Sequence, residues 1–178
     1  MATIDTSYFY GELSIAQISQ AEIAASLQII IDSREDELLL KLLGYELYKA
    51  YKAGVIATTQ KYIDIRDGKE YTDRNGNLTK WVGLKFAIGT AKKSLIANYV
   101  YWHYLTDNAS FTTGSGEKKT DLAINVSPDM KMIRAWNEMV NWNIELHEFL
   151  MTKISDYPEY ENVCIEKELF TYQNRFGL

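Results

Sequence analysis

The segment 32–54, DSREDELLLKLLGYELYKAYKAG, decides the fold class because it has the pattern of a helix. This segment and the residues before it place apolar side chains on one helical face, namely Ile23, Leu27, Ile30, Ile31, Leu38 and Leu42. Ser19 and Glu22 have the spacing of a capping box, which predicts that the helix begins at Ser19. Gly44 predicts its end, and a short helix follows over 45–53. The charged run 34–37 is expected on the solvated side.

Two further long helices are expected. The first covers 83–106 and carries apolar residues on several sides, which indicates a helix buried among other elements. The second begins with Ser127 as N-cap, Pro128 at the first helical position and Asp129 beside the helix dipole. It ends before Pro158, because the residue before a proline disfavours helical geometry.

The segments between these helices have a different character. Residues 60–82 alternate polar and apolar side chains and contain the turn pairs Asp67-Gly68 and Asn75-Gly76, which predicts an inserted β-ribbon. Residues 107–127 are rich in Gly, Ser, Thr and Lys and are expected to form a long loop with one short strand near its end.

The predicted fold class is therefore mainly α. We expect one domain, 1–178, built as a helical bundle of three long helices plus a short one. A small β-ribbon is inserted at about 60–82, and the termini, including the C-terminal tail from about 157, are extended.

Composition narrows the function classes. The chain is 47% hydrophobic and 24% charged, close to an ordinary globular protein, and has no apolar run of membrane-spanning length. Its single cysteine, Cys164, excludes an internal disulfide and suits a reducing cytoplasm. The formal charge of −5 opposes non-specific binding to nucleic acid.

Motifs that carry chemistry each lack a required part. In TGSGEKKT at 113–120, Gly116 is followed by Glu117, whereas a phosphate loop needs Lys and then Ser or Thr. DRNGN at 73–77 lacks the glycine that a calcium loop requires at its sixth position, where Leu78 stands.

The titratable residues do not form a catalytic or metal-binding pattern either. His103 and His147 lie on different helices, and His147 is expected to be a partly buried histidine with a local partner. Cys164 lacks a paired base, and the carboxylates at 32, 35 and 36 fit a charged helix face. We therefore expect no catalytic residue, no cofactor and no metal, and the chain is not expected to be an enzyme.

Aromatic residues stand out, with 13 Tyr and 4 Trp in the chain. Tyr and Trp are enriched at protein interfaces, although a tyrosine-rich core and surface explain them equally well. The lysine pair at 118–119 belongs to a solvated loop, or alternatively faces DNA inside a channel. The candidate subunit or partner contacts are Tyr8, Tyr10, Tyr71, Trp81, Phe111, Lys118, Lys119, Phe170, Tyr172 and Phe176.

Four stretches resemble one known family. The helical hairpin at 32–54, the insertion DGKEYTDRNGNLTKWVGLK at 67–85, the aromatic helix IANYVYWHYLTDN at 96–108 and the end YQNRFGL at 172–178 are similar to head–tail connector or adaptor (neck ring) proteins of tailed bacteriophages. Related proteins of Bacteroidetes-infecting phages, including the crAss-like group, have a similar pattern. The resemblance covers residues from about 8 to 178.

The resemblance implies a structural virion protein at the head–tail interface. Such proteins form an oligomeric ring, usually twelve-fold, between the portal protein and neighbouring neck or tail proteins, and DNA passes through it. They assemble in the host bacterial cytoplasm, bind no membrane and bring no catalytic residue. A stopper or tail-completion protein is the alternative within the same class, and a small enzyme or DNA-binding module is the alternative outside it.

Overall fold

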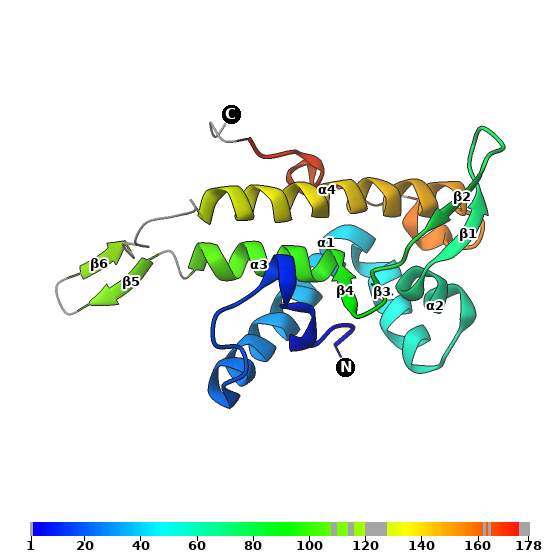
Figure 1. Cartoon of the computed structure of the whole chain (residues 1–178). Coiled ribbons are helices and arrows are strands. Elements are labelled where there is room, and N and C mark those ends of the chain that lie inside the picture. Colours follow the sequence, from blue (N-terminus) through cyan, green and yellow to red (C-terminus); the bar gives the residue numbers. More distant parts are fainter. Residues whose placement is uncertain are drawn as a thin grey trace.

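The computed structural model describes residues 2–107, 110–113, 116–119, 128–161, 163 and 165–174. For 110–113, 116–119 and 128–129 it describes the backbone only. Its helices are α1 (Ala21–Ile56), α2 (Gln60–Asp67), α3 (Leu95–Asp107) and α4 (Pro128–Thr152) (Figure 1). Short 3-10 turns occur at Thr6–Tyr8 (η1), Gly11–Leu13 (η2), Pro158–Tyr160 (η3) and Lys167–Phe170 (η4). The prediction of a mainly helical chain with three long helices, a short one and a small β-ribbon is confirmed in outline.

Three antiparallel hairpins accompany the helices. Strand β1 (Lys69–Thr72) pairs with β2 (Leu78–Trp81), and Lys69 lies opposite Trp81. Strand β3 (Lys85–Ile88) pairs with β4 (Ala91–Ser94), and Lys85 lies opposite Ser94. Strand β5 (Ser110–Thr113) pairs with β6 (Gly116–Lys119) inside the segment that was predicted as a loop. The short strand predicted near the end of that loop lies outside the described residues.

Helix α1 is bent at Gly44, where the sequence predicted a helix end. Gly44 has φ +70° and ψ 163°, a left-handed backbone conformation that glycine adopts without a steric penalty. The predicted capping box is wrong, because Gln20 is the N-cap residue and makes no side-chain cap hydrogen bond. Gly54 does not end the second part of the helix, which continues to Ile56.

Residues 60–67 form helix α2, which corrects the predicted β-ribbon at this point. Tyr62 and Ile65 are three residues apart, and both are buried, so helical geometry turns them to one side. Gly68 ends the helix with φ +94° and donates its N–H to the Asp64 carbonyl at 3.0 Å. Asp67-Gly68 is therefore a helix end, while the second predicted turn pair, Asn75-Gly76, does connect β1 and β2.

The hairpin β3–β4 occupies residues that were predicted as the start of a long helix. Helix α3 begins only at Leu95, where the buried Ser94 caps it. Ser94 Oγ accepts hydrogen bonds from the N–H groups of Ile96 and Ala97 at 3.1 and 3.4 Å, and it donates to the Leu84 carbonyl at 2.8 Å. A capping serine satisfies helix donors that otherwise have no partner.

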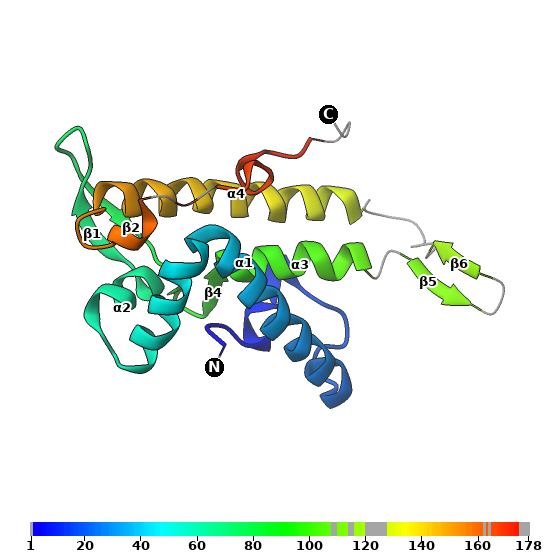
Figure 2. The same cartoon turned by 180° about the vertical axis from the view of Figure 1, so that it is seen from behind.

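The core forms around α3, whose first seven residues, Leu95 to Tyr101, are all buried. This confirms the prediction of a helix enclosed by other elements. Helix α4 lies alongside α3 in both views, and α1 packs against it as well (Figures 1 and 2). The residues before α1, here called the N-terminal arm, add Ile4, Phe9, Ile15 and Ile18 to the core.

The C-terminal segment is docked along α4 (Figure 2). Asn143 Nδ2 donates to the Leu169 carbonyl at 2.7 Å, and Trp136 Nε1 donates to the Thr171 carbonyl at 2.9 Å. Asn137 both donates to and accepts from the backbone of Gln173. The expected extended tail is therefore bound to the helix as far as the described residues reach. None of the helices in the described ranges combines the length and apolar composition needed to cross a membrane.

Replacing Gly54 with alanine should destabilise the fold, although Ala favours helices over Gly by about 1 kcal/mol. A Cβ at Gly54 would lie 1.9 Å from Tyr62 Cδ2, so the ring and α2 must shift. We expect Gly54→Ala to lower the free energy of unfolding in urea by about 1–3 kcal/mol. In a Tyr62→Ala background the same change should be neutral or stabilising, and a loss of equal size there would contradict this contact.

Candidate functional site

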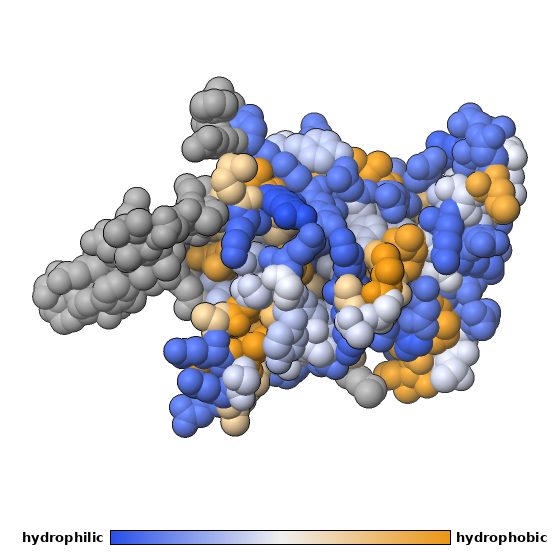
Figure 3. Space-filling view, in the orientation of Figure 1, coloured by the Kyte–Doolittle hydropathy of each residue, from blue (hydrophilic) through white to orange (hydrophobic). Residues whose placement is uncertain are grey.

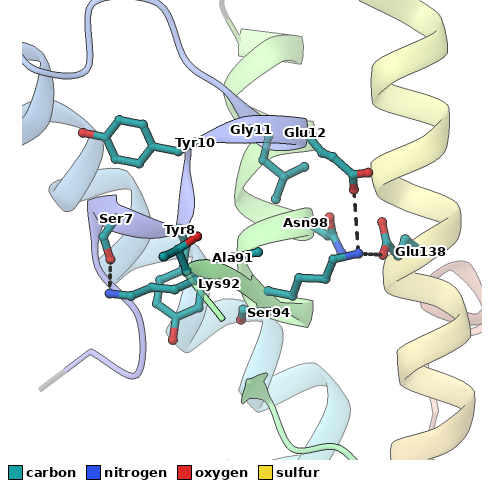
Figure 4. Close-up of a pocket in the computed structure, with 13 residues that line it drawn as sticks. Ser7, Tyr8, Tyr10, Gly11, Glu12, Ala91, Lys92, Ser94, Asn98 and Glu138 are labelled. Atoms are coloured by element: carbon teal, nitrogen blue, oxygen red, sulfur yellow. Dashed lines mark hydrogen bonds and ion pairs between the residues drawn. The ribbon is translucent and has the colours of Figure 1, made fainter. Parts of the chain in front are cut away.

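One hollow is built between the N-terminal arm and the helical core, and we call it the arm pocket (Figure 4). Its volume is about 430 Å³. It is lined by residues 7, 8 and 10–13 of the arm, residues 90–94 of the second hairpin, Asn98 of α3 and Glu138 of α4. Four separate parts of the chain therefore meet at this position.

Charged groups of both signs lie in and beside the arm pocket. The ammonium of Lys93 lies between two carboxylates, 3.8 Å from Glu12 and 3.6 Å from Glu138. Arg134 donates to Glu12 at 2.7 Å. The ammonium of Lys92 donates to Ser7 Oγ at 2.6 Å and lies 5.4 Å from the centre of the Tyr8 ring. These contacts tie the arm to β4 and α4.

Glu35 anchors the start of the arm, which corrects the prediction that it belongs to a solvated helix face. It is 1% exposed, and its two carboxylate oxygens accept the N–H of Thr3 at 2.7 and 2.9 Å. Burial raises the pKa of Glu35, and the N–H groups of Thr3 and Ile4 offset part of this shift. Lys85 holds the same point by donating to the Thr3 carbonyl at 3.1 Å.

A second, more open hollow of about 730 Å³ lies at the bend of α1, and we call it the kink groove. The bend at Gly44 forms one side, and Pro158, Glu159, Val163 and Glu166 form the other. Leu40 and Tyr45 are exposed there. Lys41 joins the two sides, since its ammonium lies 3.1 Å from Glu37 and 3.5 Å from Glu166.

Four of the candidate contact residues have surface in the described structure. Tyr8 is half-buried in the arm pocket, and Tyr10 is exposed at its edge, pointing away from the charged groups (Figure 4). Tyr172 is exposed and donates to the Asn141 side chain at 2.6 Å. Phe170 is half-buried against His147, with ring centres 5.9 Å apart.

Tyr71 and Trp81 are corrected from contact residues to core residues. Both are buried and pack on Phe149 of α4, with ring centres 5.2 and 6.2 Å from it. Trp81 Nε1 donates to the Ile65 carbonyl at 2.9 Å, so its polar group is satisfied inside the fold. The side chains of the other four candidates, Phe111, Lys118, Lys119 and Phe176, lie outside the described residues, as does Cys164.

The two histidines have structural partners. His147 Nδ1 lies 2.9 Å from the Tyr160 hydroxyl, and His103 packs its ring against Tyr99 and Trp102. Burial lowers the pKa of both. The prediction of a partly buried His147 with a local partner is confirmed. Within the described ranges, no three His, Cys, Asp or Glu side chains gather so that they could hold a metal ion.

The arm pocket could not be predicted from the sequence, because its residues come from separate parts of the chain. Lys92, Lys93 and Asn98 form no recognisable motif in the sequence, because the other groups of the pocket come from the arm and from α4. Comparisons of the chain with protein-family models, with curated proteins and with solved structures find no match. The geometry of the site therefore has to carry the interpretation.

Removing the Glu35 carboxylate should release the arm before the core unfolds. In Glu35→Ala the Thr3 N–H loses a buried charged acceptor, which we expect to destabilise the docked arm by about 1–3 kcal/mol. Hydrogen exchange of the arm should accelerate relative to that of α3. Asp32→Asn, on the exposed side of the same helix, is the control. Equal exchange in both variants would show that Glu35 does not hold the arm.

Stability should depend on pH through Glu37. Burial alone would raise the pKa of its carboxyl, but hydrogen bonds from Arg34, Lys41 and Tyr99 outweigh burial and lower it to about 2 from 4.5. Because the folded pKa is the lower one, this stabilisation is present above about pH 4.5 and is lost as the pH falls toward about 2.

The matched variants are Glu37→Gln and, at an exposed position of the same helix, Glu22→Gln. We expect Glu37→Gln to lower the free energy of unfolding at neutral pH and to flatten its decline below about pH 4.5, measured by urea unfolding. Glu22→Gln should keep the wild-type slope. A Glu37→Gln profile parallel to that of the wild type would refute the assignment.

Proposed function

We propose that the chain is a structural subunit of an oligomeric ring in the neck of a tailed bacteriophage, placed between the portal and the tail. The ring extends the channel through which DNA passes. The observation that carries the proposal is the set of large apolar side chains exposed on separate elements, together with the resemblance of the segments 32–54, 67–85, 96–108 and 172–178 to neck ring proteins.

A ring requires a head-to-tail interface, in which one surface of each subunit meets a different surface of the next. Helix α1 exposes an isoleucine near each of its ends: Ile29 is 72% exposed and Ile56 is 80% exposed. Figure 3 shows apolar residues gathered at the corner between α1 and α2, with polar surface around them. Two separated apolar positions on one long element suit contacts with two different neighbours.

The β1–β2 hairpin supports contact with a neighbouring ring or subunit. Its base is fixed by Tyr71 and Trp81 on α4, while its tip extends past α4 (Figure 1). Leu78 on this hairpin is 76% exposed. A two-stranded hairpin is only marginally stable alone, so an anchored base with a projecting apolar side chain favours a role in binding another chain.

The net charge of −5 is compatible with a channel wall along which DNA slides, because an acidic subunit does not grip the phosphate backbone. The twelve-fold copy number and the position below the portal come from the resemblance alone. A stopper or tail-completion protein would share the exposed apolar positions but would bind at a different level of the neck.

Mass photometry of the purified chain, alone and mixed with its candidate portal, tests the proposal. We expect a discrete multimer or a portal-bound complex. Ile56→Gln should weaken it at least about tenfold, because each interface loses a buried isoleucine worth about 1.5–3 kcal/mol. Lys49→Gln, at another exposed position of α1, is the matched control. A wild-type chain that stays monomeric under both conditions would refute the ring.

A further inference from the structure

Two polar groups in the arm pocket lack a hydrogen-bond partner. The Lys93 ammonium has three donors, but Glu12 and Glu138 lie 3.8 and 3.6 Å away, well beyond the distance of about 2.7–2.9 Å of a charge-assisted hydrogen bond. No described residue accepts a hydrogen bond from it. The ammonium is thus held in place electrostatically while its donors remain free for another acceptor.

Asn98 is the second group. It is 3% exposed, and its side-chain amide makes no hydrogen bond within the part of the chain that the structure describes. The Asn98 amide borders the open space of the pocket, so its donor is available to a molecule that enters it. In Figure 4 the Asn98 amide lies beside the end of the lysine that bridges Glu12 and Glu138, and it faces the pocket. An acceptor placed there would meet an amide donor and an ammonium together.

The charges around the pocket favour an anion. Glu12 is already bound by Arg134 at 2.7 Å, which compensates its charge. Lys93 then faces Glu138, the one lining carboxylate that has no arginine partner, while Asp5 beside the pocket attracts Lys92. The ammonium of Lys93, whose two carboxylate neighbours lie 3.6 and 3.8 Å away, is the positive charge that a monoanion would meet. A dianionic phosphate would be repelled more strongly by Glu138 and would leave charge uncompensated.

Apolar surface is present beside the polar groups. The half-buried Tyr8 and Leu13 and the chain around Ala91 line the same hollow. The volume of about 430 Å³ is within the range of pockets that hold small molecules, which are mostly apolar with a few convergent polar groups. The occupant should therefore combine an acceptor end with an aromatic or aliphatic body.

We propose that the arm pocket binds a carboxylate carried on an aromatic or aliphatic body. The Lys93 ammonium and the Asn98 amide donate to the carboxylate oxygens, and the body packs against Tyr8 and Leu13. The carboxylate is that of a small organic acid or that of a polypeptide, at an acidic side chain or a chain end. This site is independent of ring formation, since all of its residues come from one copy of the chain.

The test is a titration of the full chain with 3-phenylpropionate, followed by backbone amide chemical shifts. We expect shifts centred on Lys93, Ser94 and Asn98 and a dissociation constant in the millimolar range or tighter. The neutral amide of the same acid and inorganic phosphate should each bind at least about tenfold more weakly. Absence of shifts at these residues, or equal binding of the neutral amide, would overturn the proposal.

Two variants isolate the donors. Lys93→Gln should weaken binding of 3-phenylpropionate at least about fivefold, whereas Lys80→Gln, on the exposed side of β2, should not change it. Asn98→Asp keeps the size of the side chain but places a second anion at the site, so it should abolish binding. If Asn98→Asp does not fold, the Lys93 comparison alone decides, and equal affinities for Lys93→Gln and Lys80→Gln would overturn the proposal.

A second pair of probes distinguishes the two sources of the carboxylate. N-acetyl-alanyl-phenylalanine with a free carboxylate carries the same group on a peptide, and its C-terminal amide is the control. Tighter binding of the peptide than of 3-phenylpropionate assigns the site to a polypeptide, and weaker binding assigns it to a small acid. Both results support the carboxylate, while equal binding of the peptide and its amide counts against it.

Discussion

The fold depends on one constraint, which is that the first half of α3 has no solvent face. Seven consecutive residues, Leu95 to Tyr101, are buried, and they include the polar Asn98. A helix covered on every side needs neighbours on every side, and here α1, α4, the hairpin β3–β4 and the N-terminal arm provide them. Ser94 satisfies the donors at its start, because water cannot reach them. The arm is therefore part of the core. Glu35 binds its first residues through the Thr3 N–H, although burial disfavours the charged form of the Glu35 carboxyl.

The bend of α1 and the place of the C-terminal segment are linked to each other. At Gly44 the positive φ changes the direction of the helix, and a Cβ there would lie 2.8 Å from Val163 Cγ2, so the C-terminal segment closes directly over the bend. This segment continues along α4, where Asn137, Asn143 and Trp136 bind its backbone. The described parts of both terminal segments thus pack on the helices. Exposed large apolar side chains remain on α1, on the hairpins, on α4 and on both terminal segments, where they are available for contacts with other chains.

Much of the fold could be predicted from sequence where a local signal is strong. Pro128 begins α4, Gly44 interrupts α1 and Asn75-Gly76 turns a hairpin, because each depends on backbone preferences of the residues themselves. The predictions for the short elements were wrong because their secondary structure depends on tertiary contacts. Residues 60–67 are helical because Tyr62 and Ile65 pack inward. Residues 85–94, predicted as part of a long helix, form the hairpin β3–β4. The arm pocket could not be predicted at all. Thr3 lies 32 residues from Glu35, and Asn98 meets Lys93 and Glu138 only after the arm and α4 have folded around α3.

The helical core leaves several large apolar side chains exposed that it does not bury. Under the proposed function, burying Ile29, Ile56 or Leu78 against other copies or neighbouring rings would stabilise the assembly further. The most direct measurement is single-particle imaging of the purified chain with its candidate portal. The account predicts closed rings with cyclic symmetry, in which the two ends of α1 face different neighbours. Particles of monomer size only, or two-fold dimers in which one surface meets itself, would contradict it.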